Sequence, residues 1–352
     1  MTALRGIATR TTSAQRLGIF RAVVGLLTVA KAVELAWPVQ GGSSAIRAAG
    51  PLWPLLVAGW AVAGGALLAG FQTRWAAACV SLIAALLLTA GDQYSNHLYL
   101  LGVFALLLVV ADSGAAMSLD ARRRGTPPEV RSWPVTLLKV QLSVVYAFSA
   151  IGKINSHFLL GNVVYHRTEA SIVMPGVEWL AHPGLFATLS VALVLLELFV
   201  AAALWVPRLR EHAFVVGVGL HLLMVVVVSD SARDVLRLTI FGLLALSAYA
   251  LFLDVDPGSR SLSWNPACRW CGRAAGVVRR LDWFQALRYE ERADIAPGVL
   301  LVAEAPGRAV GGLDAVRRVL SVLPLTFLAA PLLRLLPIRR RPTPSVVASR
   351  TR

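Results

Sequence analysis

Long apolar runs fill most of residues 17–252, and short polar or basic segments separate them. A helix that crosses a bilayer needs about 20 mostly apolar residues. Eight runs come close to this length, and each one predicts a membrane-spanning helix. They cover residues 17–37, 52–70, 75–91, 98–116, 133–152, 184–206, 213–229 and 235–253. The runs at 75–91 and 213–229 are the shortest and carry the weakest signal.

The pattern changes at Asp254–Arg260, where Pro257 and Gly258 stop the last helix. Beyond it we expect a strand over 261–264, a helix near 270–282, a strand near 284–290, a hairpin of 299–303 with 308–311, and a helix over 314–323. This is a minimal thioredoxin-like order. The predicted fold class is mainly α: a polytopic membrane helix bundle of about eight spans, followed by a small C-terminal thioredoxin-like α/β domain.

Composition and charge support a membrane protein and predict its orientation. The chain is 57% hydrophobic and 15% charged, whereas soluble domains average about 25% charged residues. With the N-terminus inside, ten Lys and Arg fall in inner segments and five in outer ones, which follows the positive-inside bias. An even number of spans returns the C-terminus to the same side. We therefore expect a multi-pass plasma-membrane protein with both termini in the cytoplasm.

The net charge of +15 fits this topology. The arginines gather at the chain ends and inner loops, where the expected partner is the anionic lipid of the bilayer. No basic stripe is interleaved with aromatic residues, so nucleic-acid binding is not expected. The predicted regions are a basic cytoplasmic N-terminus (1–16), a membrane domain (17–255), a small C-terminal domain (261–338) and a basic, disordered tail (339–352).

Cys268 and Cys271 form a CxxC motif in the C-terminal domain. Such a pair can perform dithiol–disulfide chemistry or supply half of a zinc site. Cys79 is the third and last cysteine, so a four-cysteine zinc site within one chain is excluded. Cys268 lies between a predicted strand and a predicted helix, whose N-terminus stabilises a thiolate. The alternatives are two small buried cysteines or half of an intermolecular zinc site.

The stretch from about 264 to 338 resembles the DCC family of thiol-disulfide oxidoreductase-like proteins. The resemblance is carried by the CxxC motif, Gly307-Arg308, Gly312–Val316 and the Leu-Pro-rich ending, whereas Asn265-Pro266-Ala267 replaces the family's opening Asp-Gly. It implies that Cys268 is the attacking thiolate and Cys271 the resolving thiol, with a cytoplasmic thiol partner. In the reducing cytoplasm this pair would rest mainly as a dithiol.

Polar residues inside the apolar runs are the candidates for a membrane site. They are Arg21, Lys31, Glu34, Lys139, Glu197 and His221. Such residues are costly in lipid and usually face the bundle interior or a pathway. The alternative is structural pairing of Arg21 or Lys31 with Glu34 or Glu197. Lys31 and Glu34 are three residues apart, so they share a helix face and can neutralise each other.

Lys153 closes the fifth predicted span at its outer end. A partly buried lysine can act there as a general base. The alternative is a lysine whose side chain extends to the membrane–water interface, which is common. His97, His157 and His166 are expected around the same outer mouth, with Asp92, Glu169 and Asp234. The spacing of the histidines matches no metal motif, so we interpret them as polar loop residues and expect no metal. Residues 156–179 are a candidate interfacial lid anchored by Trp179.

Residues from about 12 to 255 resemble the HTTM domain, the membrane domain shared with vitamin K-dependent gamma-carboxylase. The resemblance is carried by Leu17–Arg21, Asp112-Ser113, Ser118–Asp120, Gln141 with Tyr146, Gly152-Lys153 and Gly161, and by Glu197 and His221. It implies that Lys153 is the base that starts quinol oxygenation and that His221 belongs to the same site. A quinone or quinol is therefore the candidate cofactor. The carboxylase's large extracytoplasmic β-rich region has no counterpart here, so gamma-carboxylation of glutamates is not expected.

Two functions of different classes follow from these patterns. One is an integral membrane oxidoreductase with a carboxylase-like site for a quinone or lipid-like ligand and a cytoplasmic CxxC module for thiol-disulfide exchange. The other is a non-enzymatic accessory or scaffold for the maturation or export of a secreted peptide, because some HTTM relatives act in producing exported peptide toxins. In the predicted topology a hydrocarbon layer of about 30 Å separates Lys153 from the CxxC motif.

Overall fold

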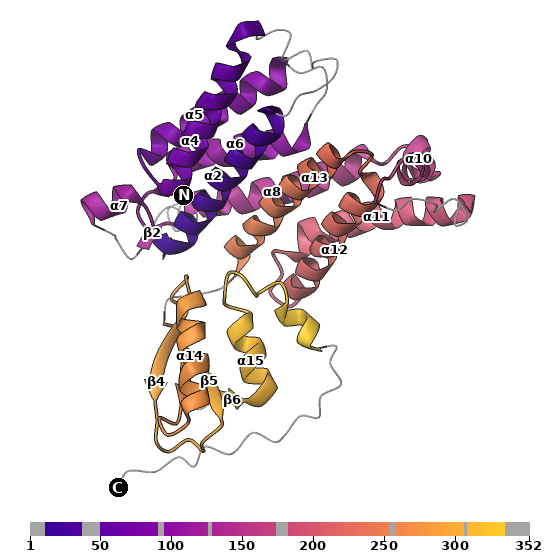
Figure 1. Ribbon diagram of the computed structural model, residues 1–352. Coiled ribbons are helices and arrows are strands. Elements are labelled where there is room, and N and C mark those ends of the chain that lie inside the picture. Colours follow the sequence, from indigo (N-terminus) through magenta and orange to yellow (C-terminus); the bar gives the residue numbers. More distant parts are fainter. Residues whose placement is uncertain are drawn as a thin grey trace, which may run out of the picture. The chain divides into compact units, whose positions relative to one another are not determined.

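The chain forms two compact units, Met1–Phe252 and Leu253–Arg352 (Figure 1). The computed structural model describes residues 11–36, 50–90, 95–125, 129–173, 182–253, 258–305 and 308–334. Most of the expected junction at 254–260 and the whole expected tail at 339–352 lie outside these residues. Within them, the first unit is helical apart from a short two-stranded sheet, and the second contains a four-stranded sheet.

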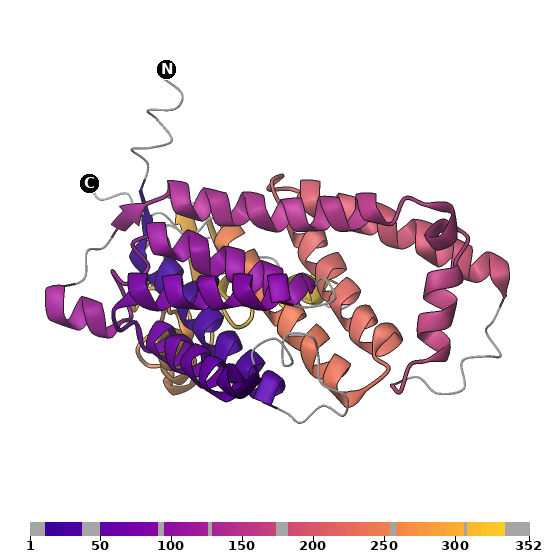
Figure 2. The same ribbon diagram turned by 90° about the horizontal axis from the view of Figure 1, so that it is seen from above.

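Apolar helices make up most of the first unit. The long helices are α2 (Ala14–Ala36), α4 (Trp53–Ala69), α5 (Thr73–Ala90), α6 (Asn96–Val110), α8 (Trp133–Gly152), α11 (Pro183–Ala203), α12 (Arg210–Val228) and α13 (Ala232–Tyr249). Shorter elements are η1 (Gly50–Leu52), α7 (Leu119–Arg124), α9 (Ser156–Leu159), α10 (Asn162–Glu169) and η3 (Ala250–Phe252). Seen from above, the first helices gather on one side of this unit and α12 and α13 on the other (Figure 2).

Each of the eight predicted spans coincides with one of these long helices. Five helical segments of the described chain are long and apolar enough to cross a membrane: η1 with α4, α8, α11, α12, and α13 with η3. α5 and α6 are apolar but shorter. α2 has 23 residues, but it carries Arg16, Arg21, Lys31 and Glu34. The helices are thus where the pattern predicted them, whereas the count of eight crossings stays a prediction.

The outward faces of these helices are strongly apolar. Leu55, Val62, Trp75 and Leu222 are 70%, 72%, 73% and 63% exposed. Large apolar side chains on an outer surface mark contact with a partner or with lipid. Their spread over several long apolar helices fits a lipid-facing exterior.

Small residues and one buried tryptophan hold the first helices together. A Cβ on Gly25 of α2 would lie 2.4 Å from the backbone nitrogen of Leu68, and Gly64 of α4 faces α2 in a similar way. Only small residues let helices approach this closely in a bilayer. Trp60 of α4 is fully buried and donates from Nε1 to the Val80 carbonyl of α5 at 3.1 Å. These contacts place α2, α4 and α5 in one packed group.

Two short strands join the start of the first unit to a later loop. β1 (Thr11–Ser13) pairs antiparallel with β2 (Glu129–Arg131), and Thr12 lies opposite Val130. β1 leads directly into α2, and only Ser132 separates β2 from α8. The sequence pattern predicted a terminal segment over 1–16, so this pairing is a feature that the pattern did not indicate.

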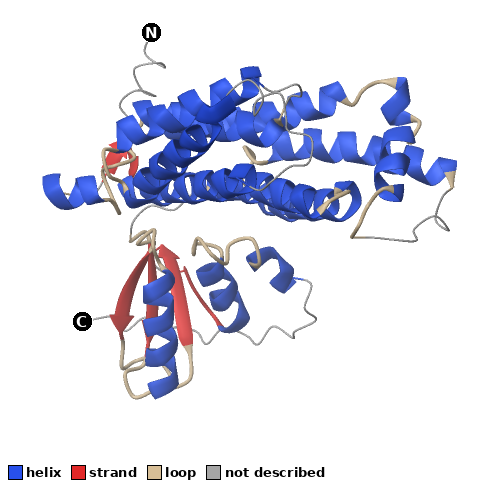
Figure 3. Cartoon of the chain, turned by 45° about the horizontal axis from the view of Figure 1, so that its top comes forward, coloured by secondary structure: helices blue, strands red, loops and turns tan. Residues whose placement is uncertain are grey.

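The second unit is a mixed four-stranded sheet with helices. Its elements are β3 (Arg260–Trp264), α14 (Arg269–Leu281), β4 (Leu287–Glu291), β5 (Leu300–Ala305), β6 (Arg308–Gly311), α15 (Gly312–Leu320) and η4 (Ala330–Arg334). The strand order is β4-β3-β5-β6. β3 runs parallel to β4 and antiparallel to β5, and β5 pairs antiparallel with β6. α14 lies across one face of this sheet (Figure 3).

The alternation of apolar residues explains the central strand. Leu262 and Trp264 of β3 are buried, with 0% and 5% exposure, and Leu262 lies opposite the fully buried Val302 of β5. Each strand and helix predicted between 261 and 323 has a counterpart within a few residues of its expected bounds. The predicted hairpin is the antiparallel pair β5–β6.

Candidate functional site

A cavity of about 850 Å³ lies among the helices of the first unit. Most of its lining is apolar and comes from α8, α10, α11 and α12, with Phe158 of α9 and Phe241 of α13. The polar and charged lining residues are Asn96, Tyr99, Tyr146, Ser149, Lys153, Arg167, Thr168, Glu197 and His221. The cavity therefore brings together three residues that the sequence singled out, Lys153, Glu197 and His221. The resemblance to the HTTM domain had implied one site for Lys153 and His221.

Lys153 and Glu197 form an ion pair on the cavity wall. Lys153 follows directly after α8, and its Nζ donates to Glu197 Oε1 at 2.9 Å and to Oε2 at 2.8 Å. It also donates to Ser149 Oγ at 2.6 Å, and Ser149 donates to Glu197 Oε1 at 3.0 Å. Glu197 is 8% exposed. The sequence offered Arg21 or Lys31 as partners for Glu197; the structure pairs it with Lys153 instead.

His221 belongs to a second polar group on the same cavity. Its Nε2 lies 2.7 Å from the hydroxyl of Tyr146, and that hydroxyl lies 2.6 Å from the hydroxyl of Tyr249. All three side chains are more than 90% buried. Among the described residues His221 Nδ1 has no hydrogen-bond partner. The ring thus has one nitrogen in a hydrogen-bonded chain, while Nδ1 is buried on the side of Gly242, where a Cβ would lie 3.5 Å from it.

Glycine makes this hydrogen-bonded chain possible. Gly217 of α12 lies beside Tyr249 of α13, and a Cβ at position 217 would be 1.8 Å from the tyrosine hydroxyl oxygen. Any larger residue would occupy the place of that oxygen. Tyr146 was part of the sequence motif, whereas Tyr249 was missed because it lies in an apolar run without a neighbouring polar residue. Its position opposite a glycine cannot be read from either segment alone.

Lys31 and Glu34 belong to a separate ion cluster outside the lining of this cavity. Glu34 accepts from Lys31, as the three-residue spacing predicted, and also from Arg233 and from Arg237 Nε, the last at 2.9 Å. The cluster connects the end of α2 to the start of α13. Glu34 is fully buried, so three cations satisfy a carboxylate that would be costly alone. His97 lies near the charges of this cluster, and its Nε2 is 2.9 Å from Ser95 Oγ.

Arg21 lies near the start of α2, at the end opposite to Lys31 and Glu34, and backbone carbonyls are its partners. Its guanidinium donates to the carbonyl oxygens of Leu67, Leu68 and Met117 at 2.6, 3.2 and 2.7 Å. Cations near the last carbonyls of a helix are stabilising, and Leu67 and Leu68 belong to the last turn of α4. Arg21 therefore closes the end of α4 and does not pair with Glu34 or Glu197.

Asp120 performs the complementary role at the start of α5. Its carboxylate accepts from the backbone nitrogens of Gln72 and Thr73 at 3.0 and 2.9 Å and from the Thr73 hydroxyl at 2.7 Å. Burial acts to raise the pKa of the Asp120 carboxyl, but the hydrogen bonds from Thr73 and Gln72 outweigh it and hold the pKa below its usual value. Part of the sequence motif Ser118–Asp120 is thus explained by helix capping.

The structure separates the outer histidines from the cavity. His157 and His166 are exposed; His157 Nδ1 lies 3.5 Å from the amide nitrogen of Asn162, and His166 Nδ1 lies 3.5 Å from a Glu169 carboxylate oxygen. In the described ranges no three His, Cys, Asp or Glu side chains are grouped as metal ligands. Within the candidate lid at 156–179, α9 and α10 line the cavity, whereas Trp179, like Asp92, lies outside the described residues.

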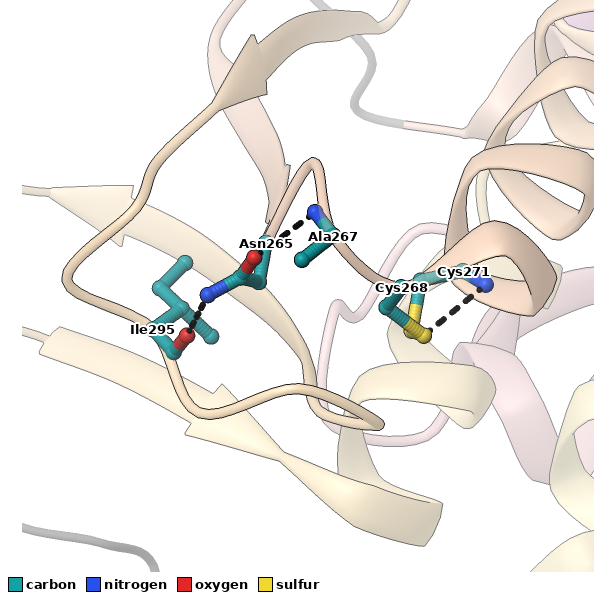
Figure 4. The surroundings of a disulfide bond; sticks show 5 residues. All are labelled: Asn265, Ala267, Cys268, Cys271 and Ile295. Carbon is teal, nitrogen blue, oxygen red and sulfur yellow. Dashed lines mark hydrogen bonds between the residues drawn. A yellow bond between two sulfur atoms is a disulfide. The ribbon is translucent and has the colours of Figure 1, made fainter.

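The CxxC motif sits at the start of α14 in the second unit. Cys268 precedes the helix, and its Sγ accepts from the backbone nitrogen of Cys271 at 3.3 Å (Figure 4). The two cysteines form a disulfide with Cα atoms 5.3 Å apart. Cys271 is 5% exposed, whereas Cys268 is only partly buried. Cys268 is therefore the more exposed of the two residues and lies where the helix dipole favours a thiolate.

Asn265 holds the loop that carries Cys268. Its Oδ1 accepts from the Ala267 backbone nitrogen at 2.8 Å, and its Nδ2 donates to the Ile295 carbonyl at 2.5 Å (Figure 4). Nδ2 also donates to the Ala293 carbonyl at 3.2 Å. The side chain is 8% exposed. The sequence noted Asn265 only as a departure from a family motif. In the structure its amide ties the CxxC loop to the segment before β5.

Taken by itself, the first unit is a polytopic α-helical membrane domain with a largely apolar cavity that carries a few polar groups on its wall. The HTTM domain model matches residues 50–256, which is more than half of the chain. The chain therefore belongs to the HTTM domain family. No curated protein and no solved structure matches it. The matched segment contains Lys153, Glu197 and His221, and α2 and the CxxC unit lie outside it.

Proposed function

We propose that the protein is an integral membrane oxidoreductase whose cavity binds a lipid-soluble ligand of the quinone class. The observation that carries this proposal is one largely apolar cavity with two polar groups on its wall, Lys153–Glu197–Ser149 and His221–Tyr146. Binding sites for small molecules combine an apolar lining with a few placed polar groups. A quinone has this composition, with an apolar ring and tail and two oxygens, and when bound it supplies two-electron redox chemistry.

The side chains present fit proton transfer at such a ligand. Lys153, as a neutral amine, would take a proton from a ligand hydroxyl placed at the cavity wall. It must first give up its own proton, and Glu197, 2.8 Å away, is a carboxylate that can receive it. On the other side of the cavity, Tyr146 fixes the His221 ring through Nε2, and both side chains would border the bound ligand. The apolar lining surrounds both groups.

Binding of a short-chain naphthoquinone to the full chain in nanodiscs tests this proposal. Toward a quinone, whose oxygens only accept hydrogen bonds, Lys153 would act as a charged donor. Hydrogen bonds to charged groups contribute about 1.5–3 kcal/mol, so Lys153→Met should weaken binding about 10- to 100-fold. Lys139→Met is the matched control, because Lys139 is on the same helix and lies 5.2 Å from the Phe252 ring, away from the cavity lining. Wild-type affinity in Lys153→Met, or absence of saturable binding, would refute the proposal.

We also propose a second activity, thiol-disulfide exchange by a thioredoxin-like second unit of the DCC type. The strand order β4-β3-β5-β6, the CxxC motif after the central strand and the partly exposed position of Cys268 support it. Cys268 would attack a partner disulfide and Cys271 would resolve the mixed disulfide. The probe is a peptide whose thiol carries a disulfide-bonded thionitrobenzoate group, which leaves when a thiolate attacks. Cys271→Ser should therefore trap a mixed disulfide between Cys268 and the peptide, whereas Cys268→Ser should not. Equal trapping by both variants, in a Cys79→Ser background, would contradict these roles.

The non-enzymatic alternative, a scaffold for a secreted peptide, is distinguished by the same variants. A scaffold retains its biological function in Lys153→Met and in Cys268→Ser when both proteins insert normally. Loss of function in either variant favours chemistry.

We further propose that both termini face the cytoplasm of the plasma membrane. Ten Lys and Arg in inner segments against five in outer ones support this orientation. After reduction, a membrane-impermeant maleimide should label Cys268 and Cys271 only in inverted vesicles. Labelling in intact cells would reverse the orientation and place the CxxC motif outside.

A further inference from the structure

The exposed face of α14 concentrates positive charge in the second unit. This 13-residue helix contains Arg269, Arg273, Arg279 and Arg280 and no acidic residue. Its buried side is formed by Cys271 and Ala275. At 100° per residue, three of the arginines, 269, 273 and 280, lie within about 40° of one another on the side opposite to Cys271. None of these three forms an ion pair among the described residues.

Two apolar side chains flank this row of arginines. Trp270 is 77% exposed and Val277 is 56% exposed, and their seven-residue spacing places them on one line along the helix. The Arg273 guanidinium carbon lies 5.2 Å from the centre of the Trp270 ring, which is a cation–π contact. The face therefore combines arginines, an aromatic ring and an aliphatic side chain. We call Arg269, Trp270, Arg273, Val277 and Arg280 the α14 face.

We propose that the α14 face docks on an anionic phospholipid surface. Arginines attract anionic headgroups, and tryptophan and aliphatic side chains enter the boundary between headgroups and acyl chains. The second unit follows a membrane domain, and eight residue steps from Phe252 to Arg260 can extend at most about 28 Å. A bilayer is thus always within reach of this unit. An acidic protein surface would match the charge of the arginines but would not provide an apolar environment for the exposed Trp270 and Val277.

Charge supplies a measurable part of this attraction. Each Lys or Arg near an anionic surface contributes about 1 kcal/mol, so removing three should weaken docking about 100-fold. The Gln variant is Arg269→Gln/Arg273→Gln/Arg280→Gln, and the matched control replaces the same three residues with Lys. All of these positions are exposed, so the fold of the unit should tolerate both sets. The proposal needs only the membrane domain and is independent of quinone binding.

A spin label at position 277 in the full chain tests the proposal. Val277→Cys is labelled in a Cys79→Ser/Cys268→Ser/Cys271→Ser background and reconstituted in bilayers of phosphatidylcholine with or without phosphatidylglycerol. With phosphatidylglycerol at low salt, the label should become accessible to oxygen and protected from a water-soluble nickel complex. The Gln variant and high salt should abolish this change, and the Lys variant should keep it.

Three results would overturn the proposal. One is a label that stays exposed to water in both bilayers. Another is an equal loss of docking in the Lys and Gln variants, because charge would then not be responsible. The third is immobilisation by added poly-glutamate but not by anionic lipid, which would identify an acidic protein as the partner.

Discussion

The contact between Gly217 and Tyr249 predicts the effect of a single added methyl group. In Gly217→Ala, the new Cβ would lie 1.8 Å from the Tyr249 hydroxyl oxygen and 2.6 Å from Cζ. Non-bonded heavy atoms need about 3.5 Å, so the tyrosine must move by about 1.5 Å. This movement would break the 2.6 Å hydrogen bond between Tyr249 and Tyr146. The hydroxyl of Tyr146 would then have only His221 as a partner.

The cost follows from two contributions. Overpacking a core by one methyl group costs about 1–3 kcal/mol, and the loss of a buried hydrogen bond costs about 1 kcal/mol more. The sum of about 2–4 kcal/mol lowers the melting temperature of a unit of this size by about 4–16 °C. Thermal unfolding of the detergent-solubilised protein, followed by tryptophan fluorescence, measures this shift. The variant should also bind the naphthoquinone more weakly, because His221 loses its support.

Gly219→Ala is the matched control for this prediction. It lies on the same helix, and a Cβ there would have no atom within 4 Å. The control therefore reports the gain in helix propensity, up to about 1 kcal/mol, without a clash. Adding Tyr249→Phe to Gly217→Ala removes the closest atom and should restore part of the stability. If Gly217→Ala melts at the temperature of Gly219→Ala, the close approach of α12 and α13 is wrong.

Three further predictions concern other contacts. Lys153→Met or Glu197→Leu alone leaves a charge without its partner, so each should lower the melting temperature more than the double variant does; additive shifts would contradict the ion pair. Asp120→Asn should cost about 1 kcal/mol at pH 7, because a charged acceptor at the start of α5 is lost. The folded pKa of Asp120 lies below the unfolded value of about 3.9, so its contribution is complete above that value and disappears as the pH falls through the folded pKa. The difference in melting temperature between wild type and Asp120→Asn should therefore close in acid, and a difference that is constant with pH would refute this role. Asn265→Ala should speed amide hydrogen exchange around Cys268 and in 293–295, measured by mass spectrometry; unchanged exchange there would mean that the amide does not hold the loop.

Local sequence patterns were sufficient to predict the positions of most helices and strands. The apolar runs located all eight long helices because a membrane helix satisfies its backbone within one continuous segment. The pair Lys31–Glu34 was predictable for the same reason, since its partners are three residues apart on one helix. The strands and helices of the second unit were also predictable, because alternation and turn residues mark each of them locally.

The candidate site depends on contacts that no local pattern contains. Lys153 and Glu197 are 44 residues apart, and Tyr146 and Tyr249 are 103 residues apart. Residue type marked Glu197 and His221 as unusual in apolar runs, and the HTTM resemblance implied one site for Lys153 and His221. Neither indicated that Glu197 pairs with Lys153. A tyrosine is common in membrane helices, so only the structure distinguishes Tyr249. The predicted pairing of Glu197 with Arg21 or Lys31 was wrong. Several basic residues carry the same charge, and helix packing, which the sequence pattern does not specify, determines which of them meets Glu197.

The pairing of β1 with β2 restricts how many times the chain can cross the bilayer between them. Thr12 and Val130 are neighbours in one antiparallel ladder, so the segments before α2 and after α6 emerge on the same face of the membrane. The helices α2, α4, α5 and α6 must then make an even number of crossings together. If α4 crosses, as its length and apolar composition allow, then at least one of α2, α5 and α6 must cross with it. Parity thus excludes one crossing or three, and leaves two or four.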